Sequence, residues 1–143
     1  MIPGEIVVVD ANVLVSCFTS EEYTPQSDWL INSGVTLLAP DFIGIETSSA
    51  FLRKVRRGEL FMADAIVSVQ AIPDRVSLQA SAPLWEGALT FAHIYGLSAY
   101  DALYVVLAQR EGCELVTADT QVADVLREHQ PDRLVWLGDL PTV

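Results

Sequence analysis

Short, continuous apolar runs recur along the chain, separated by longer segments in which apolar residues follow helical spacing. The runs at residues 6–9, 35–38, 115–117 and 134–137 are rich in β-branched side chains and do not alternate with polar ones. Continuous runs of this length are typical of strands buried on both faces, as in a parallel sheet. Residues 76–78 form a weaker strand candidate.

Helical spacing predicts the segments between these strands: residues 24–32, 41–57, 60–70, 84–95, 99–111 and 121–128. Several predicted helices are followed by a glycine, which favours the left-handed conformation that ends a helix: Gly34, Gly58, Gly96 and Gly112. The alternation predicts an α/β fold, a three-layer α/β/α sandwich around a mostly parallel central sheet. Because the 143 residues show no repeat or linker, we expect a single domain over residues 1–143.

Composition narrows the class of protein. Hydrophobic residues make up 51% of the chain, yet no apolar run approaches the roughly 20 residues that a membrane span requires. Residues 1–5 lack the basic residues of a secretory signal. Two cysteines, Cys17 and Cys113, are too few for a disulfide scaffold or a structural zinc site. We therefore expect a soluble cytoplasmic protein with no membrane partner.

The charge is strongly acidic. Nineteen acidic residues outnumber eight basic ones, and the formal net charge of −11 repels nucleic acid at long range. Binding to a polyanion would therefore need bound cations or a local basic patch. One basic cluster holds half of all Lys and Arg residues: Arg53, Lys54, Arg56 and Arg57. It fits two functions, stabilisation of a helix end before Gly58, or contact with an RNA backbone or an acidic partner.

Four acidic side chains are expected at one edge of the sheet. Asp10 directly follows the strand at 6–9, and Asp119 follows the strand at 115–117. The carboxyl ends of parallel strands share an edge, where ligands bind in open α/β sheets. The other two acids are expected early in helices that start near this edge, Glu46 about a turn and a half into its helix and Asp101 in a first turn.

Helix capping is an alternative role for three of these acids. Asp10 fits an N-cap of the next helix, and Asp119 lies just before the predicted helix at 121–128 and fits its N-terminus. Asp101 lies three residues after Ser98, as in a capping box with a shorter acid. Taken one at a time, each of these acids fits a structural role at least as well as a chemical one.

Glu46 does not fit capping, because Asp41 is the better cap candidate and residues 42–46 are too apolar for a solvated face. Four carboxylates directed at one point would repel one another, so the arrangement predicts bound divalent cations. Hard oxygen ligands favour Mg²⁺ or Mn²⁺. Such a cation lowers the pKa of water and neutralises charge that develops on a phosphodiester.

Four segments resemble the acidic motifs of PIN-domain ribonucleases, and in particular the VapC-type toxins of type II toxin–antitoxin pairs. They are VVVDANVLV at 7–15, APDFIGIETSSAFLRKVRRG at 39–58, GLSAYDALYVVLA at 96–108 and ELVTAD at 114–119. Their order and spacing resemble the family from residue 5 to about residue 139. The resemblance implies a PIN-like fold and a Mg²⁺- or Mn²⁺-dependent endoribonuclease. It also implies the metal-binding catalytic acids: Asp10, Glu46, Asp101 and Asp119.

The resemblance assigns further roles. Asn12 occupies the position of a small polar residue near the metal, and Thr117 matches a hydroxyl beside the fourth acid. Ala11 departs from the family, in which Thr or Ser is frequent, and Asp124 is either an extra acid or a solvated helix residue. The toxin role implies an RNA substrate, a cognate antitoxin and a homodimer.

Two enzyme classes with an acid after the first strand fit this chain less well. A haloacid-dehalogenase-type phosphatase requires a second acid two residues after the first, where this chain has Asn12. That class and the response-regulator receivers both need a well-placed lysine, and the chain's one lysine is Lys54. The alternative is a PIN-like module that binds RNA or protein without cleaving, against which the intact set of four acids argues. We expect structural roles for His93 and His129. We expect core or interface packing for the three tryptophans, with base stacking as the alternative: Trp29, Trp85 and Trp136.

Overall fold

The computed structural model describes residues 5–142, so the stretch at 1–4 on which the expectation about a secretory signal rests lies outside it. Within the described residues, five strands form one all-parallel sheet in the order β3-β2-β1-β4-β5. The strands are β1 (Ile6–Val9), β2 (Thr36–Pro40), β3 (Ser77–Gln79), β4 (Glu114–Thr117) and β5 (Leu134–Trp136). The predicted strands are all present, including the weak one, and within residues 5–142 the sheet contains no antiparallel pair.

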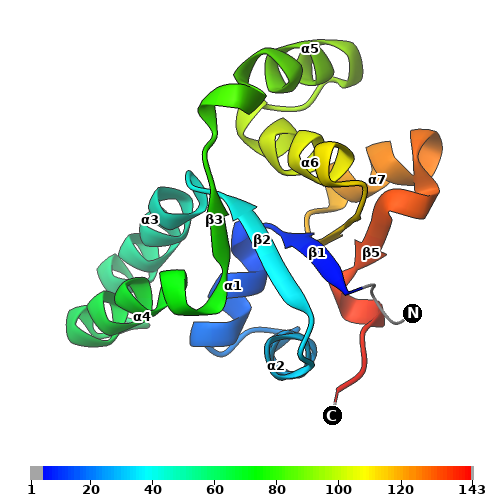
Figure 1. The fold of residues 1–143 in the computed structure, drawn as a ribbon. Helices are drawn as coiled ribbons and strands as arrows, with labels where there is room; N and C mark the ends of the chain where they lie inside the picture. Colours follow the sequence, from blue (N-terminus) through cyan, green and yellow to red (C-terminus); the bar gives the residue numbers. More distant parts are fainter. Residues whose placement is uncertain (1–4, 143) are drawn as a thin grey trace.

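Helices cover both faces of the sheet, which makes the three-layer α/β/α sandwich expected from the sequence (Figure 1). One face carries α1 (Ala11–Phe18), α2 (Thr24–Asn32), α3 (Ile43–Arg56) and α4 (Met62–Arg75). The opposite face carries α5 (Trp85–Tyr95), α6 (Ala99–Glu111) and α7 (Thr120–His129). Short 3₁₀ segments complete the chain at η1 (Ala82–Leu84), η2 (Pro131–Arg133) and η3 (Leu137–Asp139).

The direction of winding determines which helices lie on which face. From β1 the chain steps outward to β2 and β3, then returns to β4 and continues to β5 on the other side. Parallel crossovers are almost always right-handed, so reversing the direction places the later helices on the opposite face. The switch point of the sheet therefore lies between β1 and β4.

The central strands and α6 form the core. Val7, Val8 and Val9 of β1 are completely buried because helices cover both faces of this strand. Helix α6 contacts β1, β2 and β4, and Leu107 and Val105 on it are fully buried. Burial of a single such side chain contributes about 1.5–3 kcal/mol.

Helix α1 was not predicted from the spacing of apolar residues. Its sequence, ANVLVSCF, continues the apolar run of β1 and has no helical alternation, because most of its side chains are buried. The chain nevertheless becomes helical after Asp10, which caps α1 by accepting a hydrogen bond from the Asn12 backbone N–H. The cap therefore separates a strand from a helix inside one apolar run.

Two other differences concern helix ends. Helix α4 runs to Arg75 instead of residue 70, continuing through Pro73 because Ile72 is buried in the main core. Helix α3 begins at Ile43 with Phe42 at its N-cap and no side-chain capping bond, so the expected Asp41 cap is wrong. The predicted glycine stops are correct, and Gly96 and Gly112 are the left-handed C-caps of α5 and α6.

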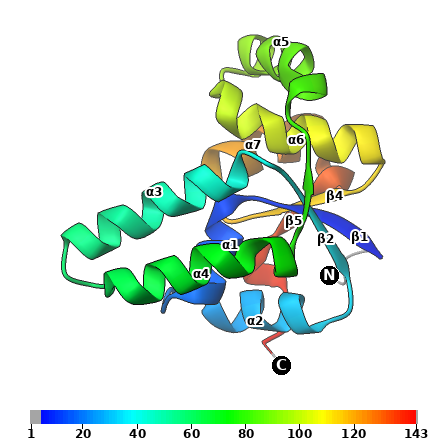
Figure 2. The ribbon, with the colours of Figure 1, turned by 60° about the vertical axis from the view of Figure 1, so that its left-hand side comes forward.

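Helices α3 and α4 pack against each other and extend beyond the sheet as a hairpin (Figure 2). Within residues 5–142, no single helix is long and apolar enough to cross a membrane. The stretch 82–95 and α6 reach that length and composition only as a pair, bent by 113°.

Candidate active site

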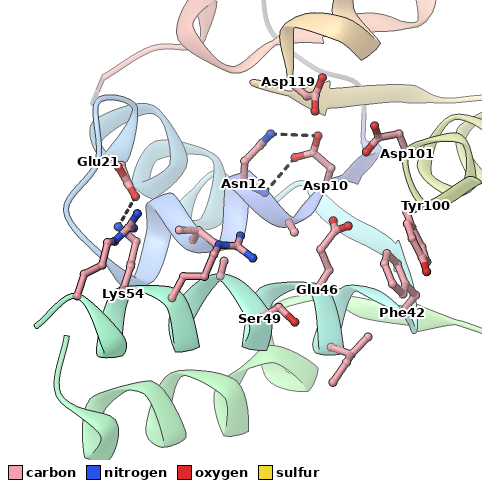
Figure 3. A pocket seen from close by; sticks show the side chains of 16 residues that line it. Asp10, Asn12, Glu21, Phe42, Glu46, Ser49, Lys54, Tyr100, Asp101 and Asp119 are labelled. Carbon is pink, nitrogen blue, oxygen red and sulfur yellow. Dashed lines mark hydrogen bonds and ion pairs between the residues drawn. The ribbon is translucent and has the colours of Figure 1, made fainter. Parts of the chain in front are cut away.

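The structure brings the four acids predicted from the sequence to one pocket, at the switch point of the sheet (Figure 3). Asp10 follows β1 and Asp119 lies two residues beyond β4, while Glu46 and Asp101 lie in the first turns of α3 and α6. All four line a cavity of about 760 Å³. Glu46 is nearer its helix start than expected, because α3 begins at Ile43.

Asp10 is the most buried acid of the pocket, with 6% of its surface exposed. Its Oδ1 accepts the Asn12 backbone N–H at 3.2 Å, and its Oδ2 accepts the Asn12 side-chain amide at 3.3 Å and the Thr117 hydroxyl. Burial raises the pKa of Asp10 to about 8; the Thr117 bond opposes this shift, and the charges of Glu46 and Asp119 add to it. In the absence of a cation, Asp10 therefore carries a proton over much of the neutral range.

Asn12 and Thr117 join the end of β1 to the end of β4. The Thr117 hydroxyl donates to Asp10 and accepts the Asp119 backbone N–H at 3.0 Å. The Asn12 side-chain oxygen accepts the Ala118 N–H at 3.1 Å. These bonds fix the first and fourth acids relative to each other.

The capping interpretation is correct for Asp10 and Asp119, whereas the cap of α6 is Ser98 and not Asp101. Asp10 and Asp119 cap α1 and α7, and Oδ1 of Asp119 accepts the Val122 N–H at 3.0 Å. Ser98 caps α6 by accepting the Asp101 N–H at 3.1 Å, which keeps Asp101 in the first turn. Burial raises the pKa of Asp101, and the charge of Asp119 raises it further. Capping and a place in the pocket are therefore compatible.

Tyr104 makes a contact at the pocket that was not predicted from the sequence. Its buried hydroxyl donates to Oε1 of Glu46 at 2.9 Å. Burial raises the pKa of Glu46 and that of Tyr104, while the nearby Arg53 charge lowers the pKa of Glu46. The signal was available, because Tyr104 follows Asp101 by three residues and such pairs share one helix face.

The structure places only part of the basic cluster at the acid pocket. Arg53, Lys54 and Arg57 line the acid pocket, whereas Arg56 does not. Lys54 forms an ion pair with Glu21 at 2.6 Å, and its side chain is 13% exposed. Arg57 pairs with Glu59 at 3.3 Å. Lys54 and Arg57 each have an acidic partner outside the set of four acids, whereas the charge of Arg53 acts on Glu46 and lowers its pKa.

The remaining candidates lie outside the pocket. His93 and His129 are exposed on helices, and Asp124 is an exposed residue paired with Arg127 at 3.3 Å. Trp29 and Trp136 pack against the core, as expected. Trp85 is 64% exposed, so it is not a core residue, and packing of Trp85 at an interface stays a prediction.

The donor chemistry of the pocket fits a hard divalent cation. Four carboxylates and the Asn12 amide supply oxygen ligands of the kind that Mg²⁺ and Mn²⁺ prefer. Within residues 5–142, none of the four acids forms an ion pair. In the same part of the chain, no three His, Cys, Asp or Glu side chains are arranged closely enough to hold a metal directly. A cation here would therefore complete its shell with water and substrate oxygens.

Comparison with known proteins gives the following similarities. A model of the PIN domain matches residues 7–127. A protein named ribonuclease VapC3, from Pyrobaculum aerophilum, is 27% identical over 120 residues, which are 82% of this chain and 92% of that protein. Two solved structures are also similar, and at their identities they show the fold alone.

The first is the crystal structure of PAE2754 from Pyrobaculum aerophilum, with a TM-score of 0.68 and 24% identity; the match covers 83% of this chain and 78% of that one. The second is a chain of a toxin–antitoxin complex from Klebsiella pneumoniae, with a TM-score of 0.66 and 14% identity, covering 92% and 97%. Both similarities extend over most of the sheet and its helices.

Proposed function

Because this chain belongs to the PIN-domain family, we propose that it is a metal-dependent endoribonuclease and the toxin of a toxin–antitoxin pair. One observation carries the proposal: four carboxylates, delivered by β1, α3, α6 and β4, meet in one pocket at the switch point of the sheet. The name of the Pyrobaculum relative, a ribonuclease, supports RNA as the substrate.

Asp10, Glu46, Asp101 and Asp119 would hold one or two Mg²⁺ or Mn²⁺ ions. Bound there, the metal would polarise a phosphodiester and lower the pKa of water, the chemistry required for hydrolysis. The acids need fixed positions for this, because a small misplacement at a reacting centre lowers the rate strongly.

The chain supplies these positions through the neighbouring polar groups. Asn12 and Thr117 orient the Asp10 carboxylate and tie it to β4. Tyr104 orients Glu46 through its hydroxyl. Arg53 lies where its charge reaches the pocket, and in the proposal it binds a phosphate of the RNA.

The alternative, a PIN-like module that binds without cleaving, is less well supported. Burial raises the pKa of Asp10, Glu46 and Asp101, and this shift means that the charged carboxylates destabilise the metal-free fold. A module that only binds RNA or protein gains nothing from buried, mutually repelling carboxylates. A nuclease gains its cation site.

A cognate antitoxin and a second copy of the chain are the proposed protein partners. The toxin–antitoxin complex among the similar structures supports the first. Exposed apolar side chains on and beside α4, including Phe61, Met62 and Val67, are also consistent with a protein contact, since exposed apolar patches mark interaction sites. The homodimer rests on the family resemblance and is checked by light scattering.

The activity is tested with purified protein and structured RNA, in Mg²⁺ or Mn²⁺ and then in EDTA. We expect cleavage products with 5′-phosphate ends that form only with metal. The variant Asp101→Asn should lose cleavage while its circular dichroism spectrum is unchanged, because Ser98 and not Asp101 caps α6. Cleavage that continues in EDTA, or full activity of Asp101→Asn, would overturn the proposed mechanism.

A further inference from the structure

Two aromatic rings form one rim of the acid pocket. Phe42, just before α3, and Tyr100, in the first turn of α6, lie with ring centroids 5.0 Å apart and an interplanar angle of 11°. Figure 3 shows the pair beside Asp101 and Glu46, with Lys54 and Glu21 on the far side of the acids. Phe42 also contacts Tyr104 at a centroid distance of 6.5 Å, so it is held from below by the core.

The two faces of the Tyr100 ring differ. One face lies on Phe42, whereas the residue as a whole is 60% exposed. Large aromatic side chains stabilise a fold when they are buried. Tyr100 is mostly exposed and gains little of this stabilisation, so packing within the chain does not explain why its ring is held at the rim of the pocket. Most of the Tyr100 residue therefore remains available to a second planar group.

The rings also connect two hollows. Phe42 and Tyr100 line the acid pocket and a neighbouring hollow of about 290 Å³, which the exposed Trp85 borders. The surface thus runs from Arg53, past the acids, to the aromatic pair and then to Trp85. A nucleic acid strand is complementary to this surface, because its phosphates can contact Arg53 and a cation at the acids while a neighbouring base contacts an aromatic ring.

We propose that Tyr100 stacks an unpaired RNA base next to the phosphate held at the acids, and that Phe42 is the positioning residue that keeps its ring flat. This inference rests on the proposed function for the identity of the polymer. It adds the residue that would contact a base: the Tyr100 ring would take an unpaired one, because a paired base is enclosed in its own helix. The net charge of −11 weakens long-range attraction, and stacking on an aromatic ring does not depend on that charge.

Binding of short oligoribonucleotides tests the stacking site without requiring cleavage. The background is Asp119→Asn in Mg²⁺, which should not cleave, and Asn retains the cap of α7. Fluorescence anisotropy compares an adenylate oligomer with a ribose-phosphate oligomer of equal length that lacks bases. Tyr100→Ala should weaken binding of the adenylate oligomer about tenfold and leave binding of the abasic oligomer unchanged. Tyr100→Phe should bind both as the parent does.

Two further variants sharpen the result. Leu89→Ala removes a large apolar side chain that is 67% exposed but outside both hollows, and it should change neither affinity. Phe42→Leu should weaken binding of the adenylate oligomer alone, by a smaller factor than Tyr100→Ala. Equal affinity of the parent for both oligomers, including undetectable binding of both, would overturn the proposal.

A protein contact at Tyr100 would give a different pattern. If Tyr100→Ala shifted the oligomeric state and weakened binding of both oligomers equally, the ring would belong to an interface between copies, and the stacking proposal would be wrong. Cleavage by the wild type with no base-dependent effect of Tyr100→Ala would also reject stacking while leaving the nuclease proposal intact. Base-dependent binding without any cleavage would reject only the nuclease.

Discussion

Asp10 is both a helix cap and a pocket acid. From the sequence, these two roles had been treated as alternatives. The run VVVDANVLV showed a charge inside an apolar segment, and the structure shows that its carboxylate caps α1 while facing Glu46 and Asp119. The positions of the four acids followed from strand ends and helix starts. Tyr104 was missed although its position one turn after Asp101 places it on the same helix face. Glu21 was not predicted, because its contact with Lys54 joins segments that are distant in the sequence.

The stability of the metal-free protein should fall as pH rises. Burial raises the pKa of Asp10 from 3.8 to about 8, so between these values the folded state binds more protons than the unfolded state. The free energy of unfolding then decreases by up to about 4 kcal/mol between about pH 5 and pH 8. Glu46 and Asp101, whose pKa values are also raised, act in the same direction.

Urea denaturation in EDTA at several pH values measures this slope. The variant Asp10→Asn keeps the cap but has no titrating carboxyl, so its stability should depend less on pH, and at pH 8 it should exceed that of the wild type. A wild type that is equally stable at both ends of the range, or parallel slopes for the two proteins, would show that Asp10 is not desolvated in solution.

At the scale of elements, the predicted bounds of a helix are correct where a local sequence signal marks the end of that helix. Helix α6 has its predicted bounds because Ser98 caps one end and Gly112 takes the left-handed conformation at the other. Helix α1 was missed because complete burial removes the polar positions that give helical periodicity. The range predicted for α4 ended too early, because the local sequence cannot show that Ile72, beyond the expected end, is buried in the core.

The end of α3 gives a matched pair of variants for RNA binding. Arg53 lines the acid pocket and Arg56 does not, although both are arginines in the same last turn. In the non-cleaving background, Arg53→Gln should reduce the slope of log affinity against log salt by about 0.7, the value for one phosphate contact of a single strand. Arg56→Gln should leave the slope unchanged.

Anisotropy titrations over a range of salt concentrations measure both slopes. If both variants reduce the slope equally, net charge and not a phosphate contact is the cause. If neither does, the cluster serves the helix end, as the alternative interpretation of the sequence holds.

At the scale of the whole molecule, the winding of the sheet determines where the chemistry lies. The chain reverses direction between β1 and β4, and the acids that follow these strands meet at that point. The positions of the strand ends in the sequence were therefore sufficient to predict that the acids lie at the carboxyl edge of the sheet. Charge balance was not sufficient to predict how cations and anions pair, since Lys54 and Arg57 pair with Glu21 and Glu59, whereas within residues 5–142 no ion pair involves the four acids.

Calorimetric titration with Mn²⁺ tests the central claim, that the four acids form a cation site, most directly. The titration compares the wild type with Asp101→Asn and with Asp124→Asn, which removes an exposed acid outside the pocket. Near pH 8, where Asp10 loses its proton, the wild type and Asp124→Asn should bind Mn²⁺ with equal affinity, and Asp101→Asn should bind at least about tenfold more weakly. Equal binding by all three proteins, or no saturable binding by the wild type, would contradict the claim.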